Sequence, residues 1–248
     1  VEQVFKDAGL PEGVFTNIHA THDQSSTIIE DPRVRGVTVT GSDAAGSRVA
    51  EQAGKLIKPV VLELGGSDPQ IVLADADLDY TAQSAMYRFF GAGQVCASNK
   101  RIIVAKEAYE EFIDQYKQVA DQMVPGDPLD PATTIGPLVN EAAADEVRDQ
   151  IKRAVEHGAE AVEVGPKVPE GGTWVQPTFL LNVTRDNPVF HEEIFGPVPM
   201  IIRAEDEDDA IDIANDSKYG LAGSIYGGDV EHMMKLVRRM DTGLVTIN

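Results

Sequence analysis

The sequence of 248 residues predicts a layered α/β fold, and three observations lead to this prediction. Segments with the apolar spacing of helices alternate with short runs rich in valine, isoleucine and leucine, as in α/β proteins. Several of these runs close on glycine or proline, which mark turns between elements. No internal repeat or low-complexity tract is present, which argues against a solenoid. The length fits one large domain or two small ones.

The first part of the chain, residues 1–65, predicts part of a nucleotide-binding sheet. It starts as the end of a helix that stops at Gly9-Leu10-Pro11. The predicted strands that follow are Val14–His19, Gly36–Thr40 and Pro59–Leu64, and a helix is predicted from Gly41 to Gly54. Strands connected through a helix are typical of the parallel sheets that bind dinucleotides.

From Gly66 the pattern restarts and predicts a second α/β domain, residues 66–248. Its strands are predicted at 70–73, 101–105, 198–203 and 245–248, and its helices at 77–90, 108–122, 141–157, 207–215 and 230–240. Both chain ends fall inside predicted elements, without the polar, frayed segments usual at natural termini. We therefore expect the chain to be part of a longer protein.

The charge balance limits the possible partners. Lysine and arginine total 21 and aspartate and glutamate total 41, which gives a formal net charge of −20. Such a surface repels nucleic acid and anionic lipid, so neither is an expected partner. No apolar run could span a bilayer and no signal peptide is recognisable, so we expect a cytoplasmic protein. The scattered carboxylates resemble a salt-adapted surface, with an ordinary acidic cytosolic enzyme as the alternative. The run Glu205–Asp209 is interpreted as a solvated helix start.

The single cysteine, Cys96, excludes an internal disulfide framework. It follows Gly93, where the backbone can approach a ligand closely, at a predicted loop-to-helix junction. Backbone N–H groups at such a junction would favour a thiolate and an oxyanion. A thiolate is the side-chain nucleophile most available near neutral pH. The alternative is a buried structural cysteine. The five histidines show no metal-site spacing, so no metal is expected.

Glu63 lies at the end of an apolar strand, and one leucine separates it from the glycine pair Gly65-Gly66. A carboxylate at this place is either solvated at a turn or directed into a cleft. Taken without any motif, the solvated turn is the more common arrangement. In a partly apolar cleft the carboxylate would be a stronger base, able to take a proton from a thiol or a water molecule.

Four stretches together resemble the NAD(P)-dependent aldehyde dehydrogenases that use a cysteine nucleophile. They are Thr40–Gly46, Leu62–Gly66, Gly93–Cys96 and Glu192–Val198, and their order and separations match the family over essentially the whole chain. Any one of them alone would be a weak signal, because short glycine-containing strings recur by chance. The implied fold is a partial Rossmann-like coenzyme domain followed by an α/β catalytic domain of the aldehyde dehydrogenase fold.

The resemblance implies oxidation of an aldehyde to an acid with NAD or NADP, with Cys96 as the nucleophile and Glu63 as the general base. It implies further that Glu193 holds the nicotinamide ribose and that Phe195 packs beside the nicotinamide, whereas Glu192 is an ordinary surface charge. Asp43 is expected to point away from the coenzyme. The residues expected to bind the coenzyme are Gly41, Ser42, Gly46, Leu64, Gly65, Glu193 and Phe195.

For the substrate, the segments Leu64–Pro69 and Gly93–Ala97 resemble succinate-semialdehyde dehydrogenases. Phe90 and Gly91 stand where several of those enzymes have arginine and asparagine, so Arg88 is the candidate for the distal carboxylate. Val95 and Ala97, on either side of the thiol, are the other expected substrate contacts.

The family's oxyanion asparagine and coenzyme lysine would precede Val1, in an N-terminal half that this chain lacks together with a C-terminal tail. We therefore expect the chain alone to be inactive and the full-length parent to be a homo-oligomer. Two other functions are considered. One is a non-catalytic binding or structural role of the same fold, and the other is a coenzyme-free cysteine hydrolase, disfavoured because no histidine lies in a partnering motif.

Overall fold

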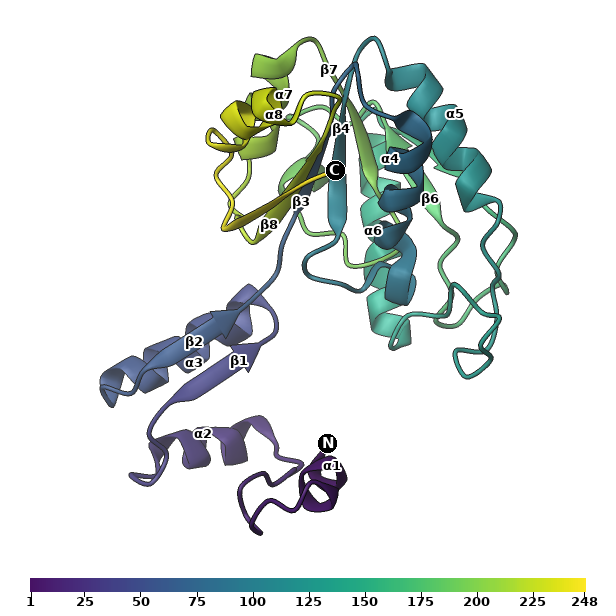
Figure 1. Cartoon of the computed structure of the whole chain (residues 1–248). Coiled ribbons are helices and arrows are strands. Elements are labelled where there is room, and N and C mark those ends of the chain that lie inside the picture. The colour runs from purple at the N-terminus through teal and green to yellow at the C-terminus, as the bar shows by residue number, and fades with distance from the viewer. The chain divides into compact units, whose positions relative to one another are not determined.

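The computed structural model describes residues 1–248 and divides into two compact units (Figure 1). Unit 1 is Val1–Leu64 and unit 2 is Gly65–Asn248, so the division falls one residue before the predicted domain boundary. Each unit is described by itself.

Unit 1 is built around a parallel strand pair joined by a helix. Strand β1 (Val37–Thr40) pairs with β2 (Val60–Glu63), and helix α3 (Asp43–Lys55) connects them. Thr40 lies opposite Glu63, so both strands end at the same edge. Ser42 caps α3 by accepting a hydrogen bond from the Ala45 N–H at 3.3 Å. This local signal explains why the sequence predicted α3 well.

In the first part of the chain one predicted strand is wrong and one helix was missed. Residues 14–19 form no strand, and Phe15 instead stacks on Phe5 of helix α1 (Glu2–Asp7) at 4.9 Å between ring centroids. Helix α2 (His22–Glu30) was not predicted. It begins with a capping box, in which the side chains of Thr21 and Gln24 each bond the other's backbone N–H. The segment lacks a long apolar stripe, so its periodicity is weak although its cap is clear.

Unit 2 contains one seven-stranded sheet in the order β5-β6-β7-β4-β3-β8-β9. All neighbours are parallel except β5 and β6, which are antiparallel. The strands are β3 (Asp68–Val72), β4 (Asn99–Ala105), β5 (Glu160–Glu163), β6 (Thr178–Leu181), β7 (Met200–Ala204), β8 (Ala222–Tyr226) and β9 (Leu244–Ile247).

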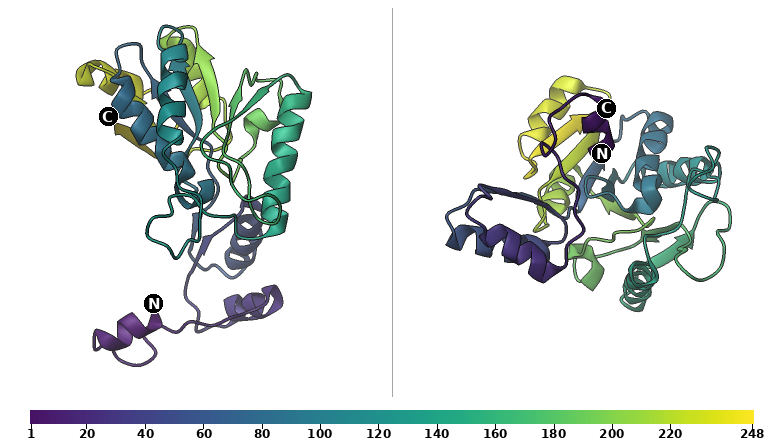
Figure 2. Two further views of the ribbon diagram at one scale, coloured as in Figure 1. Left: turned by 90° about the vertical axis from the view of Figure 1, so that its right-hand side faces the viewer. Right: turned by 90° about the horizontal axis from the view of Figure 1, so that it is seen from below.

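Helices cover both faces of this sheet (Figures 1 and 2). Helices α4 (Leu78–Ala85) and α5 (Tyr109–Ala120) lie on one face, and α7 (Glu207–Asn215) and α8 (Val230–Val237) on the other. Helix α6 (Glu141–Glu156) packs against β5 and the short 3₁₀ helix η2 (Pro188–His191). A fully buried aromatic cluster joins α5 to its neighbours and consists of Phe112 and Tyr116 of α5 with Phe89 and Phe179. None of the helices combines the length and apolar character needed to cross a bilayer.

Strands β5, β6 and β8 were not predicted. The edge strand β5 is largely exposed and reads Glu-Ala-Val-Glu, and β8 contains glycine and serine, which have low strand propensity. Pairing with β3 and β9 on its two sides fixes β8. The predicted helix 77–90 also changes character, because α4 ends at Ala85 and continues as the 3₁₀ helix η1 (Met86–Gly93).

The acidic run Glu205–Asp209 lies at the largely exposed start of helix α7, as predicted, and its carboxylates also make defined contacts. Helix α7 begins at Glu207, and Asp206 is its N-cap, accepting from the Asp209 N–H at 2.9 Å. Glu207 contacts His232 at 2.8 Å, and Asp208 pairs with Arg239 at 2.8 Å. Most carboxylates of the run therefore have defined partners.

Candidate active site

Cys96 lies in a turn between η1 and β4 and is partly buried, with partly buried Val95 before it and exposed Ala97 after it. The turn leads into a strand. The predicted loop-to-helix junction is therefore wrong, and no helix N-terminus begins at this thiol. The sequence showed a glycine-rich break after η1 but not which element follows it.

Lys100, on β4, holds this turn from inside. Its side chain is completely buried, and Nζ donates hydrogen bonds to the carbonyl oxygens of Val95 (2.8 Å) and Cys96 (2.7 Å). Nζ also lies 3.3 Å from Oε1 of Glu193. Burial, with a smaller contribution from the nearby Arg88 charge, lowers the pKa of Lys100 to about 8, although Glu193 and Asp68 act in the opposite direction.

Two glycines make room for this arrangement. Oε1 of Glu193 accepts a hydrogen bond from the Gly66 N–H at 3.1 Å. A Cβ on Gly65 would lie 2.3 Å from Oε2 of Glu193, and a Cβ on Gly66 would lie 2.6 Å from the Cys96 carbonyl oxygen. Residue 66 therefore requires glycine because its neighbour is backbone, whereas a Cβ on residue 65 would displace the Glu193 carboxylate. The two glycines bring this carboxylate and the Cys96 turn against the start of β3.

Arg88 has a structural position that contradicts its predicted role as a substrate contact. It is fully buried, and its guanidinium donates to the carbonyl oxygens of Gly93 (2.9 Å) and Ile194 (2.6 Å) and to Oγ of Ser98 (2.9 Å). Burial lowers the pKa of Arg88 to about 10. The side chain ties the turn to the segment that carries Glu193, and it presents no surface to a ligand.

The segment around Glu193 is fixed from both sides. A Cβ on Gly93, whose φ is +75°, would lie 2.1 Å from the Gly196 carbonyl oxygen, so backbone touches backbone here. Glu192, expected to be an ordinary surface charge, instead accepts two hydrogen bonds from Arg153, at 2.7 and 2.8 Å, which lower the pKa of Glu192. Phe195 is 42% exposed.

In unit 1, the predicted coenzyme loop lies at the carboxyl end of the strand pair. Gly41 and Ser42 are exposed, and the Gly41 N–H bonds the Glu63 carbonyl oxygen at 3.0 Å. A Cβ on Gly46 would lie 2.5 Å from Cδ2 of Leu64, so this glycine allows α3 to pack on the residue after β2. An exposed helix N-terminus favours an anion such as a pyrophosphate, which fits these residues.

Glu63 is exposed at the end of β2. It belongs to unit 1 and Cys96 belongs to unit 2. The expectation that the two side chains face one cleft therefore stays a prediction.

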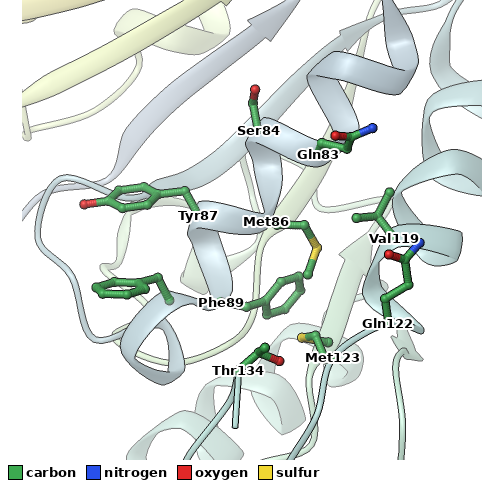
Figure 3. Close-up of a pocket in the computed structure, with 10 residues that line it drawn as sticks. Gln83, Ser84, Met86, Tyr87, Phe89, Val119, Gln122, Met123 and Thr134 are labelled. Atoms are coloured by element: carbon green, nitrogen blue, oxygen red, sulfur yellow. The ribbon is translucent and has the colours of Figure 1, made fainter. Parts of the chain in front are cut away.

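Unit 2 has one cavity between η1 and α5 and another beside Ala97 of the Cys96 turn. The first, of about 460 Å³, is lined by apolar and polar side chains, and Figure 3 shows Met86 and Phe89 of η1 on one side and Val119 of α5 on the other. The second, of about 270 Å³, is lined by Ala97 and by Asp68. Burial raises the pKa of Asp68 to about 6, and its Oδ2 has no hydrogen-bond partner.

Sequence reasoning missed Lys100 and Asp68. Lys100 and Arg101 stand immediately before the apolar run Ile-Ile-Val of a predicted strand, and this was a usable signal for Lys100, because charged residues are rarely buried without a defined partner. No group of three or more histidine, cysteine, aspartate or glutamate side chains is arranged to hold a metal ion.

Comparison with known proteins identifies the family of the chain. A family model described as "Aldehyde dehydrogenase family" matches residues 1–248. The chain is 44% identical to a succinate-semialdehyde dehydrogenase [NADP(+)] of Deinococcus radiodurans, over all of this chain and 52% of that protein. It is 40% identical to the succinate semialdehyde dehydrogenase [NAD(P)+] Sad of Escherichia coli, over all of this chain and 54% of that protein.

Solved structures give the same result. The succinic semialdehyde dehydrogenase of Streptococcus pyogenes, in complex with NADP+, is 42% identical and superposes with a TM-score of 0.94 over 99% of this chain and 54% of its own. Gox0499 is 44% identical, with a TM-score of 0.95 over 99% of this chain and 54% of its own. The chain thus spans about half the length of these relatives. The match over all its residues shows that the chain belongs to the aldehyde dehydrogenase family.

Proposed function

We propose that this chain carries the nucleophile of an aldehyde dehydrogenase that oxidises a small aldehyde, with succinate semialdehyde as the favoured substrate. The observation that carries the proposal is the setting of Cys96. The only thiol of the chain lies in a turn whose backbone is held by two buried cations, Lys100 and Arg88. A structural cysteine would not need such a support.

In the proposed reaction, the Cys96 thiolate adds to the aldehyde carbon. A carbon–sulfur bond forms, the carbonyl electrons move to oxygen, and the product is a thiohemiacetal. NAD or NADP, when bound, supplies the acceptor for the hydride that then leaves this carbon. The resulting thioester is attacked by a water molecule that gives its proton to Glu63. The carbon–sulfur bond breaks, the acid is released and the thiolate is restored.

We assign coenzyme binding to residues of both units. The exposed Gly41 and Ser42 at the start of α3, with Gly46 one turn later, would hold the pyrophosphate. Glu193 would accept hydrogen bonds from the ribose hydroxyls. Its Oε1 already bonds Gly66 and faces Lys100, so Oε2 is the oxygen left for this task. Leu64, Gly65 and the exposed Phe195 complete the proposed set.

Val95 and Ala97 remain the proposed substrate contacts, because they flank the thiol. The substrate class rests on the relatives named above. It is tested by comparing kcat/KM for succinate semialdehyde and for butanal, which has the same chain length without the carboxylate. A preference of at least about tenfold for succinate semialdehyde is expected, since losing a charged hydrogen-bonding partner costs about 1.5–3 kcal/mol. Equal values would remove this substrate assignment and leave the reaction type intact.

The reaction itself is tested in the complete enzyme. Cys96→Ala should abolish dehydrogenation and leave coenzyme binding unchanged, because the thiol carries the covalent step. Alkylation of Cys96 by iodoacetamide, followed with and without coenzyme, reports whether the thiol borders the coenzyme site. Turnover retained in Cys96→Ala would overturn the proposal. The chain alone should not turn over, since losing even one oxyanion donor costs about 10²- to 10³-fold. We also propose a cytoplasmic homo-oligomer for the complete protein.

A further inference from the structure

Lys100 is a buried cation that the proposed mechanism does not use. It is the only lysine with a fully buried side chain, and its ammonium group lies where three segments meet. The charged groups that face it are Arg88, Glu193 and Asp68. Its hydrogen bonds go to two successive carbonyl groups, those of Val95 and Cys96, so it fixes the orientation of two adjacent peptide planes beside the thiol.

Peptide geometry determines where the N–H groups of these planes point. In a trans peptide the C=O and N–H bonds point in opposite directions. Because both carbonyl oxygens point at Lys100, the N–H groups of Cys96 and Ala97 point away from it. Neither N–H donates a hydrogen bond in the structure. The turn therefore offers two adjacent free donors on the side away from the buried ammonium, where Ala97 is exposed.

Gly66 supports the same orientation from the neighbouring segment. The Cys96 carbonyl oxygen occupies the place where a Cβ on residue 66 would lie, at 2.6 Å. The carbonyl is thus held between the glycine backbone and the Lys100 ammonium. A reversed peptide plane would direct its N–H at the cation and lose the hydrogen bond.

We propose that Lys100 is a positioning residue, which turns the N–H groups of Cys96 and Ala97 outward so that they stabilise the oxyanion formed when the thiol adds to a carbonyl carbon. This inference rests on the proposed function, because it takes Cys96 as the nucleophile. Preorganised backbone donors of this kind contribute about 10²- to 10³-fold each to reactions that pass through an oxyanion. Lys100 itself is fully buried and therefore acts through the turn.

The test compares two reactions of the Cys96 thiol that need no coenzyme. With p-nitrophenyl acetate, the sulfur attacks the acetyl carbon, an oxyanion forms, and p-nitrophenolate leaves as the thioester is made. With iodoacetamide, the sulfur displaces iodide and no oxyanion forms. Both rate constants are measured at pH 7 on the complete enzyme, with the modification of Cys96 followed by mass spectrometry, and their ratio isolates the contribution of the oxyanion donors.

Lys100→Met should reduce the ester rate about 10²-fold or more and change the iodoacetamide rate less than about threefold. Lys100→Arg, which keeps a cationic donor, should restore much of the ester rate. Lys106→Met is the matched control, because Lys106 is on the surface and pairs only with exposed Glu205; it should change neither rate. Gly66→Ala, which displaces the Cys96 carbonyl from the other side, should reproduce the selective loss.

Lys100→Met leaves Glu193 without its partner and can fail to fold, which circular dichroism will show. The double variant Lys100→Met/Glu193→Gln removes both charges together and is then measured in its place. The proposal is overturned if the folded variant loses both rates in parallel, or neither. A complete wild-type enzyme that is not acylated at Cys96 at all would instead overturn the proposed function, so the two failures are distinguishable.

Discussion

Unit 1 and unit 2 share a local pattern, a strand followed by a helix and a parallel strand. The strands of this pattern are far more buried in unit 2 than in unit 1. In β2 of unit 1, Val61 and Leu62 are 57% and 37% exposed. In unit 2 every residue of β3 is buried. The difference follows from sheet size, because two strands and one helix cannot cover an apolar face, whereas seven strands between two helix layers can.

This contrast extends to the site. In unit 1 the proposed coenzyme residues are held by a helix cap and strand ends, which are local features. In unit 2 the Cys96 turn is held by buried charges that reach across the chain, such as Arg88 bonding the Ile194 carbonyl. We therefore expect substitutions in unit 2 to have larger consequences than chemically matched substitutions in unit 1.

The largest expected difference is in the apolar cores. Phe179→Ala removes a fully buried ring that stacks on Tyr116, and it should lower the free energy of unfolding of unit 2 by about 3–5 kcal/mol. Val61→Ala, at a half-exposed position of unit 1, should cost less than about 1 kcal/mol. Urea unfolding, followed separately by Trp174 fluorescence for unit 2 and by amide exchange for unit 1, measures both. Equal losses of unfolding free energy in the two variants would contradict the expected difference between the two units.

The next effect is pH dependence from Asp68. Burial raises the pKa of Asp68 from 3.8 to about 6, so its stabilising contribution is complete below pH 4 and is lost as the pH rises through 6. The change is on the order of 3 kcal/mol. Asp68→Asn should remove this slope and make unit 2 more stable than wild type at pH 7. Thermal melting between pH 4 and 7 measures it, and an unchanged slope in the variant would contradict the assignment.

Two glycines with the same backbone angle provide a smaller, closely matched comparison. Gly93 and Gly9 both have φ of +75°, but a Cβ on Gly93 would meet the Gly196 carbonyl at 2.1 Å, whereas a Cβ on Gly9 would meet nothing within 4 Å. Gly9→Ala should cost only the left-handed backbone penalty, about 1–2 kcal/mol. Gly93→Ala should cost about 2 kcal/mol more, because the contact is with rigid backbone. If both variants lose the same free energy of unfolding in urea, the backbone around Gly93 can shift to accommodate the added Cβ.

The smallest expected effect concerns the acidic surface. Glu110 and Asp114 are exposed like charges four residues apart on α5, an arrangement that costs about 0.2–0.5 kcal/mol. Asp114→Asn should raise the melting temperature slightly at low salt, and the gain should vanish near 1 M sodium chloride, where the Debye length is about 3 Å. Asp208→Asn, which removes the partner of Arg239, is the control and should not be stabilising. A gain that persists at high salt would exclude charge repulsion as its cause.

The sequence predicted those parts of the structure that have local signals. Ser42, as a helix N-cap, predicts the start of α3, and the apolar runs predict β3 and β4. Strand β8 could not be predicted, because its order comes from neighbours far away in sequence. The same holds for the site. Gly66 and Cys96 were recognisable by motif, but the burial of Arg88 and Lys100 depends on carbonyl groups that only the fold brings together. Arg88 was accordingly misassigned to the substrate.

The most direct test of the central claim is to trap the acyl group on Cys96. The complete enzyme with Glu63→Gln is mixed with succinate semialdehyde and NADP, quenched in acid, and digested for mass spectrometry. The account predicts a succinyl group on the peptide that contains Cys96, together with a burst of reduced coenzyme, because hydride transfer proceeds while release of the thioester is slowed. Steady turnover with Cys96 unmodified, or the acyl group on another residue, would contradict it.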